Sequence, residues 1–337
     1  MACLNLSFGS MSNTRGGHTE CVSTVVSDYE IVTRRAGILD NSERGKLAFT
    51  GSGAAEFLQG QVTNDVEALA PGRGCYAALL TAKGKMLADL RILRAEDELL
   101  LDTERSALQD VFNVLRRAMI GYDVQLHKRT LERGLLSLLG PEAHEVAGVP
   151  DLAGEPEHSH RAIELAGIPA RAIRTYLGID LLCDAADTGA LREALSAAGA
   201  RPVEEAAAEC LRIEHGRPRY GLDLDDTVIP QEAGLNERAV SFTKGCYVGQ
   251  ETVARLHYRG RPNRHLRGLR LSAPANPGAP LRRDDREVGR LASTTVSPRL
   301  GPIGLALVRR EVEPGATVRV GDDGIGAEVV ELPFGAG

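Results

Sequence analysis

Hydrophobic and polar residues recur with two different spacings in the first part of the chain, and these spacings predict both helices and strands. Apolar residues at helical spacing predict helices at 29–44, at 108–119 and around Phe57. Ser52 precedes the helix around Phe57 and is a candidate N-cap. Short apolar runs predict strands at residues 46–50, 75–80, 86–93 and 98–102. Because residues 82–85 form a turn signal, the second and third of these strands are predicted to pair as a hairpin.

The middle of the chain repeats this mixture, whereas the end is predominantly β. The middle predicts strands at 135–139, 170–175 and 178–183, helices at 141–147, 191–198 and 204–215, and an exposed connection at 148–160. Beyond Pro262, short β runs separated by Gly, Pro and Asp lie at 266–271, 288–296, 304–308, 317–320 and 327–331. Such runs are typical of a small antiparallel barrel or sandwich. The mixed order of elements indicates an α+β fold.

Composition limits the possible classes of protein. The chain has 337 residues, enough for about two domains, and 43% of them are hydrophobic, so it can build packed cores. Its formal net charge is −6, which is unsuited to coating nucleic acid non-specifically. Aromatic residues make up only 4%, so few residues are available for stacking on bases. RNA binding is therefore not expected, although a local basic patch would leave it open.

Features of cellular location point to the cytoplasm. No apolar run approaches the roughly 20 residues that span a bilayer, so no membrane association is expected. Residues 1–27 are polar, have no apolar signal-peptide core and are predicted to be a flexible leader; Met11 is a second possible start. The cysteines are scattered, with no zinc-ligand spacing, and are typical of reduced cytoplasmic thiols: Cys3, Cys21, Cys75, Cys183, Cys210 and Cys246.

Residues 212–255 carry the clearest chemical signal. Cys246 follows Lys244 and precedes a predicted helix at 248–256, and both a nearby cation and a helix N-terminus stabilise a thiolate. The flanking Gly245 and Gly249 permit a loop wrapped closely around a ligand. A small buried cysteine in a tight turn is an equally good interpretation of the local chemistry.

Charged residues in and after this segment have two possible roles each. Glu214, Asp223 and Glu232 lie among small and apolar residues, where a buried carboxylate could bind the N–H groups of a heterocycle such as a pterin. Each could instead form a salt bridge with a nearby arginine such as Arg212. Residues 252–270 contain six arginines, two histidines and no acid, which suits either an anionic ligand or a solvated linker.

Several motifs together resemble one known family. They are R-I-E-H-G-R-P-R-Y-G, I-P-Q-E-A-G-L and K-G-C-Y-V-G-Q-E, with L-Q-G-Q-V-T-N-D-V at 58–66 and K-G-K-M-L-A-D-L at 83–90. On these motifs the chain resembles the YgfZ-type folate-binding proteins, relatives of the glycine-cleavage T-protein aminomethyltransferase. The resemblance extends from about Tyr29 to the C-terminal β region. It implies a GcvT-like ring of two interleaved α/β subdomains and a C-terminal antiparallel β-barrel around a folate channel.

The resemblance also implies boundaries. A folate-binding region would span residues 28–260, with roughly 50–133 inserted as one subdomain into the other, and the barrel would span 261–334.

The same resemblance implies a ligand and site residues. Tetrahydrofolate would be the cofactor, bound by Glu214, Tyr220, Lys244, Gln250 and Arg255. The transferase carries paired aspartates where this chain has Ala88-Asp89, and it lacks K-G-C-Y, which favours the YgfZ-type branch. Proteins of that branch support assembly or repair of iron–sulfur clusters and cluster-dependent tRNA thiomethylation.

Two functions follow from these implications. In the first, Cys246 is the functional thiol of a folate-dependent factor whose partners are iron–sulfur client proteins or a thiol-redox protein. In the alternative, Asp89 serves a folate-dependent aminomethyl or one-carbon transferase. A single cysteine near His257 and His265 is too small a ligand set to hold a metal cluster, so no resident metal is expected.

Overall fold

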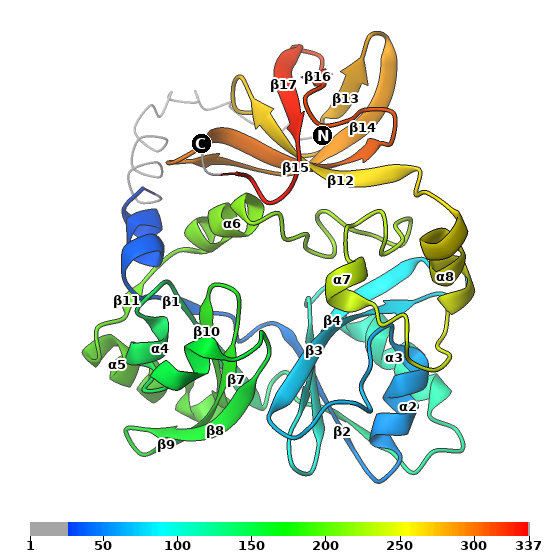
Figure 1. Ribbon diagram of the computed structural model, residues 1–337. Helices are drawn as coiled ribbons and strands as arrows, with labels where there is room; N and C mark the ends of the chain where they lie inside the picture. The colour runs from blue at the N-terminus through cyan, green and yellow to red at the C-terminus, as the bar shows by residue number, and fades with distance from the viewer. Residues whose placement is uncertain (1–25, 336–337) are drawn as a thin grey trace, which may run out of the picture.

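The computed structural model describes residues 26–335, which form two α/β bodies side by side beneath a β-barrel (Figure 1). The leader predicted for residues 1–27, Met11, Cys3 and Cys21 therefore lie largely or wholly outside the described part of the chain. Residues 26–34 are helical. Within residues 26–335, no helix is both long and apolar enough to cross a membrane.

The first α/β body is a five-stranded antiparallel sheet packed against two helices. The strand order is β3-β4-β5-β2-β6. Its elements are β2 (Gly45–Thr50), α2 (Ala54–Gln61), β3 (Arg73–Leu80), β4 (Met86–Arg94), β5 (Leu99–Thr103), α3 (Leu108–Ala118) and β6 (Gln125–Lys128). Phe49 from the sheet, Phe57 from α2 and Leu115 from α3 are fully buried in one core. The apolar side chains on one face of the sheet thus pack against the two helices, and the sheet and the helices form two layers around one core.

The second α/β body uses strands from both sides of the first. Its strand order is β11-β1-β7-β10-β9-β8. Its elements are β1 (Gly37–Asp40), β7 (Arg133–Leu139), α4 (Ala143–Val146), η1 (Pro150–Gly154), β8 (His160–Leu165), β9 (Ile168–Arg174), β10 (Gly178–Asp184), η2 (Ala185–Asp187), α5 (Thr188–Ala197) and β11 (Arg201–Pro202). The chain thus leaves this sheet after β1, builds the five-stranded sheet, and returns at β7.

The last part of the chain is a closed barrel with strand order β12-β15-β14-β13-β16-β17. The strands are β12 (Arg264–Leu271), β13 (Pro280–Arg283), β14 (Arg286–Ser297), β15 (Gly301–Arg309), β16 (Thr317–Val320) and β17 (Ile325–Val330). Leu269, Leu281 and Val308 are fully buried inside it. Closure pairs every strand edge and protects them from other chains. The predicted α+β class, with a GcvT-like arrangement and a terminal barrel, is confirmed.

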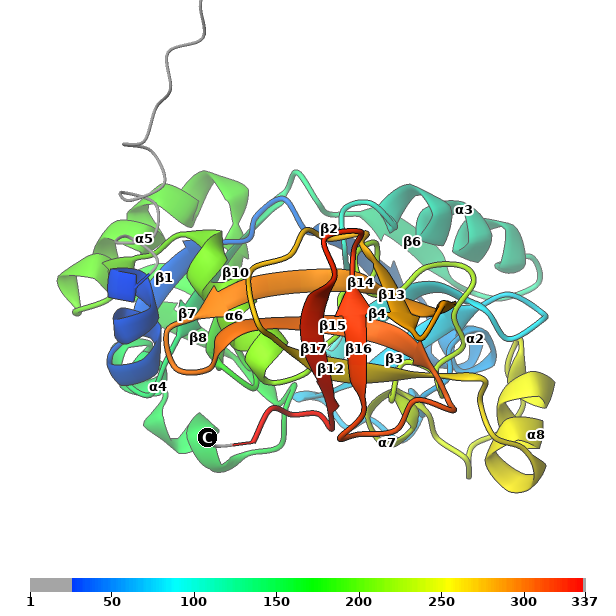
Figure 2. The ribbon, with the colours of Figure 1, turned by 90° about the horizontal axis from the view of Figure 1, so that it is seen from above.

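Three helices connect the bodies. α6 (Glu205–Glu214) lies beneath the barrel and packs against β14 and β15, as Figure 2 shows from above. α7 (Asn236–Ala239) packs against β3 of the first body. α8 (Gln250–Arg259) lies at the outer edge of the molecule in both views (Figures 1 and 2). The long segment between α6 and β12 therefore touches all three bodies.

Two local predictions are wrong. The helix predicted over 29–44 ends at residue 34, and β1 follows, because Ile38 pairs with Leu138 of β7 across a long sequence separation. That pairing satisfies the backbone within the sheet. Ser52 does not cap α2: the N-cap residue is Gly53, and the Ser52 hydroxyl donates to Asp123 at 2.6 Å. Strands β6, β8, β11 and β13 were not predicted.

Candidate functional site

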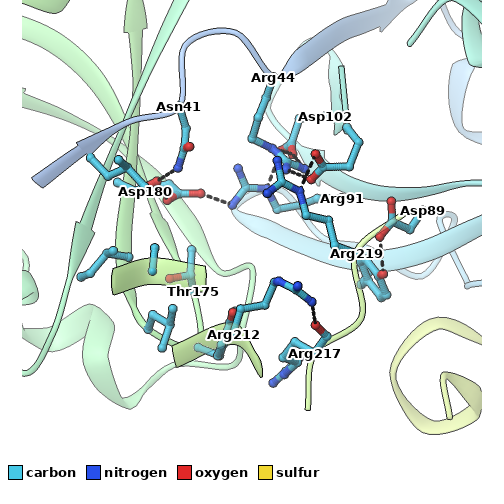
Figure 3. Close-up of a pocket in the computed structure, with 18 of the residues that line it drawn as sticks. Asn41, Arg44, Asp89, Arg91, Asp102, Thr175, Asp180, Arg212, Arg217 and Arg219 are labelled. Atoms are coloured by element: carbon cyan, nitrogen blue, oxygen red, sulfur yellow. Dashed lines mark hydrogen bonds and ion pairs between the residues drawn. The ribbon is translucent and has the colours of Figure 1, made fainter. Parts of the chain in front are cut away.

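A cavity of about 310 Å³ opens where the two α/β bodies and α6 meet. Figure 3 shows charged side chains pointing toward it from β4, β5, β10 and α6. Its volume falls in the range of ordinary small-molecule sites. The cavity is therefore the candidate binding site for a small-molecule ligand.

Asp89 is one of the acids that line this cavity. It lies on β4 and is buried, and its carboxylate accepts a hydrogen bond of 2.7 Å from the Tyr76 hydroxyl. Within residues 26–335, no other side chain donates a hydrogen bond to this carboxylate; the Thr103 hydroxyl donates to the backbone carbonyl of Asp89. Burial raises the pKa of Asp89, although the hydrogen bond from Tyr76 acts in the opposite direction. A carboxyl group with a raised pKa is protonated more readily than an exposed one, and a ligand N–H that binds it would favour its charged form.

An ionic network forms one wall of the cavity and joins the two sheets. Arg91 of β4 contacts Asp102 of β5 at 2.5 Å and Asp180 of β10 at 2.6 Å (Figure 3). Arg44 adds a second contact to Asp102 at 3.0 Å. Although burial acts in the opposite direction, Arg91 and Arg44 lower the pKa of Asp102. Because these charges neutralise one another, the network shapes the wall of the cavity, and a ligand would be bound by other side chains.

A second network holds α6 against the following loop and the barrel. Arg212 of α6 contacts Asp223 at 2.7 Å, and the Asp223 carboxylate also accepts the backbone N–H of Ser293 in β14. Arg219 contacts Glu104, the residue that follows β5, at 3.0 Å. Glu232 likewise contacts Arg264 at 2.9 Å. Of the two interpretations of Asp223 and Glu232, the structure therefore shows the salt bridges.

Two arginines lie over tyrosine rings at the cavity. Arg238 lies 4.9 Å from the ring centre of Tyr76, and Arg217 lies 4.5 Å from that of Tyr176. Arg217 also contacts Glu157 at 3.2 Å, whereas Arg238 has no acid within ion-pair distance in residues 26–335. Burial, followed by the charge of Arg217, lowers the pKa of Arg238. An unneutralised guanidinium in a cavity favours an anionic ligand group.

Glu214 lies away from the cavity, at the C-terminal end of α6. Its carboxylate accepts hydrogen bonds from Tyr29 at 3.0 Å and Arg299 at 3.1 Å, and also from Ser297. These bonds tie the N-terminal helical segment and the β14–β15 turn to α6. The structure thus places Asp89 at the cavity, whereas Glu214 belongs to a hydrogen-bond network elsewhere in the protein.

Lys244 points into the first body rather than toward the neighbouring thiol. Its ammonium group donates to the carbonyls of Gln59, Val62 and Asn64 at 2.6–2.9 Å, at the C-terminal end of α2. Burial lowers its pKa to about 8. Lys244 therefore anchors the K-G-C-Y loop to α2.

The other predicted residues are spread over separate surfaces. Tyr220 packs between the core of the first body and the α7 region, and burial raises its pKa. Gln250 is the first residue of α8, and Arg255 is exposed on the same helix. Neither lines the cavity.

Cys246 is exposed on the loop before α8, and the loop geometry depends on two glycines. Gly249 has φ +83°, and a Cβ atom there would lie 2.5 Å from the Thr81 carbonyl oxygen. Gly84 in the β3–β4 turn has φ +76° and would place a Cβ atom 2.8 Å from Thr252. Only glycine fits these positions, so the hairpin tip fixes the loop that presents Cys246.

The remaining thiols and possible metal ligands provide no second centre. Cys75 is half-buried, and Cys183 and Cys210 are buried; burial raises the pKa of each. No group of three or more His, Cys, Asp or Glu suited to a metal ion occurs in the part of the chain that the structure describes.

Sequence reasoning missed Tyr76, Tyr176, Arg217 and Arg238 as cavity residues. Tyr76 could have been found, because the predicted hairpin places it on the same face of the sheet as Asp89. The others come from loops and from α7, and only the folded arrangement brings them to Asp89.

Comparison with known proteins defines a class: proteins that combine a glycine cleavage T-protein N-terminal domain with a C-terminal barrel domain. The glycine cleavage T-protein N-terminal domain matches residues 8–244, and its C-terminal barrel domain matches residues 264–335. The chain belongs to the glycine cleavage T-protein family.

Individual relatives match over nearly the whole chain. An aminomethyltransferase of Geobacillus kaustophilus is 35% identical over 93% of this chain and 90% of that protein. A chloroplastic protein of Arabidopsis thaliana, named only as a transferase, is 30% identical over 88% of this chain and 71% of that protein. The crystal structure of the glycine cleavage system aminomethyltransferase T from Bartonella henselae superposes with a TM-score of 0.82 and 26% identity, covering 93% of this chain and 90% of that one.

Proposed function

We propose that the cavity binds tetrahydrofolate, with Asp89 at the pterin and Arg238 near the negatively charged tail. The observation that carries this proposal is the buried Asp89 carboxyl group, whose one side-chain donor is Tyr76. The residues fit the ligand chemically: a reduced pterin offers N–H donors to a carboxylate, and a glutamate tail offers carboxylates to a guanidinium. Bound tetrahydrofolate would supply the nitrogen atoms that carry one-carbon groups. Tyr76 would orient Asp89, and the Arg91 network would keep the wall rigid.

We further propose that this folate site serves the maintenance of iron–sulfur enzymes, as in the YgfZ-type branch. Two observations support this. The K-G-C-Y-V-G-Q-E loop exposes Cys246 to partners, and Ala88 stands beside Asp89, so only one acid remains at that pair. Because the described residues offer no metal-ligand cluster, the thiol of Cys246 would act together with a partner protein. Such a partner would be an iron–sulfur client or a thiol-redox protein.

The alternative is a folate-dependent aminomethyl or one-carbon transferase that uses Asp89. The position of this acid in the cavity favours it, as do the relatives named aminomethyltransferases. The two functions place different demands on the chain. A transferase needs Asp89 and can do without a surface thiol, whereas the iron–sulfur role needs Cys246.

Cells lacking the protein, complemented with single variants, distinguish the two functions. We expect Cys246→Ser to lower the activity of iron–sulfur enzymes to that of uncomplemented cells, while Val248→Ser, on the same loop, restores it. Purified protein is assayed in parallel for transfer of a one-carbon group to tetrahydrofolate. Full iron–sulfur activity with Cys246→Ser would contradict the first role. Transfer that is lost in Asp89→Asn and kept in Cys246→Ser would establish the alternative.

A further inference from the structure

The outward side of α8 is separate from the folate cavity and has its own chemistry. The helix buries Val253 toward the α7 region, and none of its residues lines the cavity. Figures 1 and 2 both show α8 at the edge of the molecule, with its outer side facing away from the barrel and from both sheets. We call the surface made by Phe242, Arg255, His257, Tyr258, Arg259 and Arg261 the α8 face.

Three aromatic rings are gathered on the α8 face. The ring of His257 stacks on Phe242 with 3.7 Å between centroids and an interplanar angle of 17°. Tyr258 meets His257 edge-on at 4.8 Å, and 67% of Tyr258 is exposed. In a chain with only 4% aromatic residues, a group of three rings is unusual; two of them, His257 and Tyr258, are exposed, and Phe242 is partly buried against the α7 region. Because His257 is itself exposed, this stack leaves ring surface open to a further planar group.

The positive charge of the basic segment is also concentrated here. Arg255, Arg259 and Arg261 are exposed, and no acid lies within ion-pair distance of any of them in residues 26–335. Farther along the segment Arg264 pairs with Glu232 and Arg267 pairs with Glu331, and the partly buried Arg270 lies over the Phe334 ring. The exposed arginines of the segment that have no acidic partner in residues 26–335 are thus those on α8 and just after it.

The helical spacing brings these groups together. Arg255, Tyr258 and Arg259 stand at positions i, i+3 and i+4 of α8, which places them on one side of the helix. Arg255 is therefore a helical neighbour of both Tyr258 and Arg259, at the i, i+3 and i, i+4 spacings, and Arg259 directly follows Tyr258 in the sequence. Glu251 lies one helical turn before Arg255, on the same side of α8, and is also exposed.

We propose that the α8 face binds single-stranded RNA. Proteins that hold single strands combine aromatic rings, on which bases stack, with cations that follow the phosphate backbone. Both components occur here side by side: two exposed rings, and arginines that have no acidic partner in residues 26–335. An acidic polypeptide would satisfy the arginines but would give no use to the exposed rings, and a duplex hides its base faces from stacking. A single strand accounts for both features.

The test is fluorescence anisotropy of a 5′-labelled 12-nucleotide oligouridylate with the full chain, at potassium chloride concentrations between about 50 and 200 mM. Three phosphate contacts on a single strand give a slope of log K against log salt of about −2. We expect Arg255→Glu/Arg259→Glu to weaken binding at least about tenfold and to reduce that slope by about 1.4. Tyr258→Ala should weaken binding by about fivefold or more and leave the slope unchanged, because stacking releases no counterions.

The matched control is Arg116→Glu, an exposed arginine on α3, which should bind as the wild type does. Absence of binding at 50 mM salt would overturn the proposal. So would equal affinities of wild type and Tyr258→Ala, or full displacement of the RNA by polyglutamate at matched charge, since either would make this a general anion or acidic-protein surface. Thermal melts of each variant, expected to match the wild type because the changed side chains are exposed, exclude unfolding as the cause.

Discussion

The Tyr76 hydroxyl donates a hydrogen bond of 2.7 Å to Asp89 across the β3–β4 hairpin, although the two residues are not directly opposed. The register pairs Asp89 with Ala78 and Tyr76 with Arg91, so the bond runs diagonally on the face that lines the cavity. Ala78 leaves room for that diagonal contact. The hairpin therefore fixes the orientation of the one acid on which the proposed folate chemistry depends.

Replacement of Asp89 by asparagine should change how stability depends on pH. Burial raises the pKa of Asp89, so the folded protein keeps this proton to a higher pH than the unfolded chain does. The corresponding stability is present below the unfolded pKa of about 3.8 and is lost as the pH rises through the folded value. Asp89→Asn should therefore be more stable than wild type at pH 7, and this advantage should shrink toward pH 4. Urea denaturation across this range measures it.

The exposed Asp97→Asn is the control for that experiment and should track the wild type at every pH. An Asp89→Asn variant that is less stable than the wild type at pH 7 would show that the charged carboxylate is stabilised rather than strained by its surroundings.

Removal of the Lys244 ammonium group should loosen the K-G-C-Y loop. Lys244→Met leaves three carbonyls at the end of α2 without their donor, which should cost about 1–3 kcal/mol of unfolding free energy. The cost should grow between pH 8 and 10.5. Burial lowers the pKa of Lys244 to about 8, so over this interval the unfolded wild type binds more protons and the folded wild type gains stability.

Urea titrations of Lys244→Met at pH 7 and pH 9.5 check this prediction, with Lys83→Met, an exposed lysine of the β3–β4 turn, as the comparison. A deficit that is smaller at pH 9.5 than at pH 7 would mean that the charged ammonium is favoured in the fold.

Two glycines of the same loop should respond differently to alanine. Gly249→Ala forces a Cβ atom to within 2.5 Å of a backbone oxygen at φ +83°, and should cost about 2 kcal/mol or more. Gly245→Ala meets no atom within 4 Å and should be nearly neutral. Denaturation midpoints of the pair provide the comparison. Equal effects would contradict the close crossing of Gly84 and Gly249.

Breaking the Arg212–Asp223 pair should have the largest effect on stability. The Asp223 side chain is fully buried, so Arg212→Met leaves an uncompensated charge and should cost about 3–5 kcal/mol. Arg290→Met, which removes an exposed ion pair on the barrel, should cost less than about 1 kcal/mol. Thermal unfolding of both variants measures the difference. Similar losses would indicate that water reaches Asp223.

The strands and helices were largely predictable from local pattern, and the exceptions have long-range causes. Residues 37–40 carry apolar residues that fit a helix as well as a strand, and only β7, about 100 residues later, decides between them. Strand β13 was missed because Pro280–Arg283 is short and polar, with Leu281 as its single buried residue. The β3–β4 pairing has an irregularity between Leu79 and Leu80, so counting residues outward from the turn does not give the correct pairs.

The site was predictable only where its residues lie in motifs. Asp89 stands in a recognisable segment and does reach the cavity, whereas Arg238 and Tyr176 carry no local signal. Lys244 illustrates the converse: its position two residues before Cys246 suggests electrostatic support for the thiol, yet its long side chain reaches the end of α2 instead. Spacing along a loop fixes the backbone neighbours of a residue but leaves the direction of its side chain undetermined.

Calorimetric titration of tetrahydrofolate into the wild type, Arg238→Gln and Cys246→Ser tests the central claim most directly. A reduced folate in the cavity predicts that the wild type and Cys246→Ser bind with the same affinity. Arg238→Gln should bind about tenfold more weakly or worse, because a charge-assisted contact is lost. Absence of binding by the wild type, or equal binding by Arg238→Gln, would contradict the placement of the folate in this cavity.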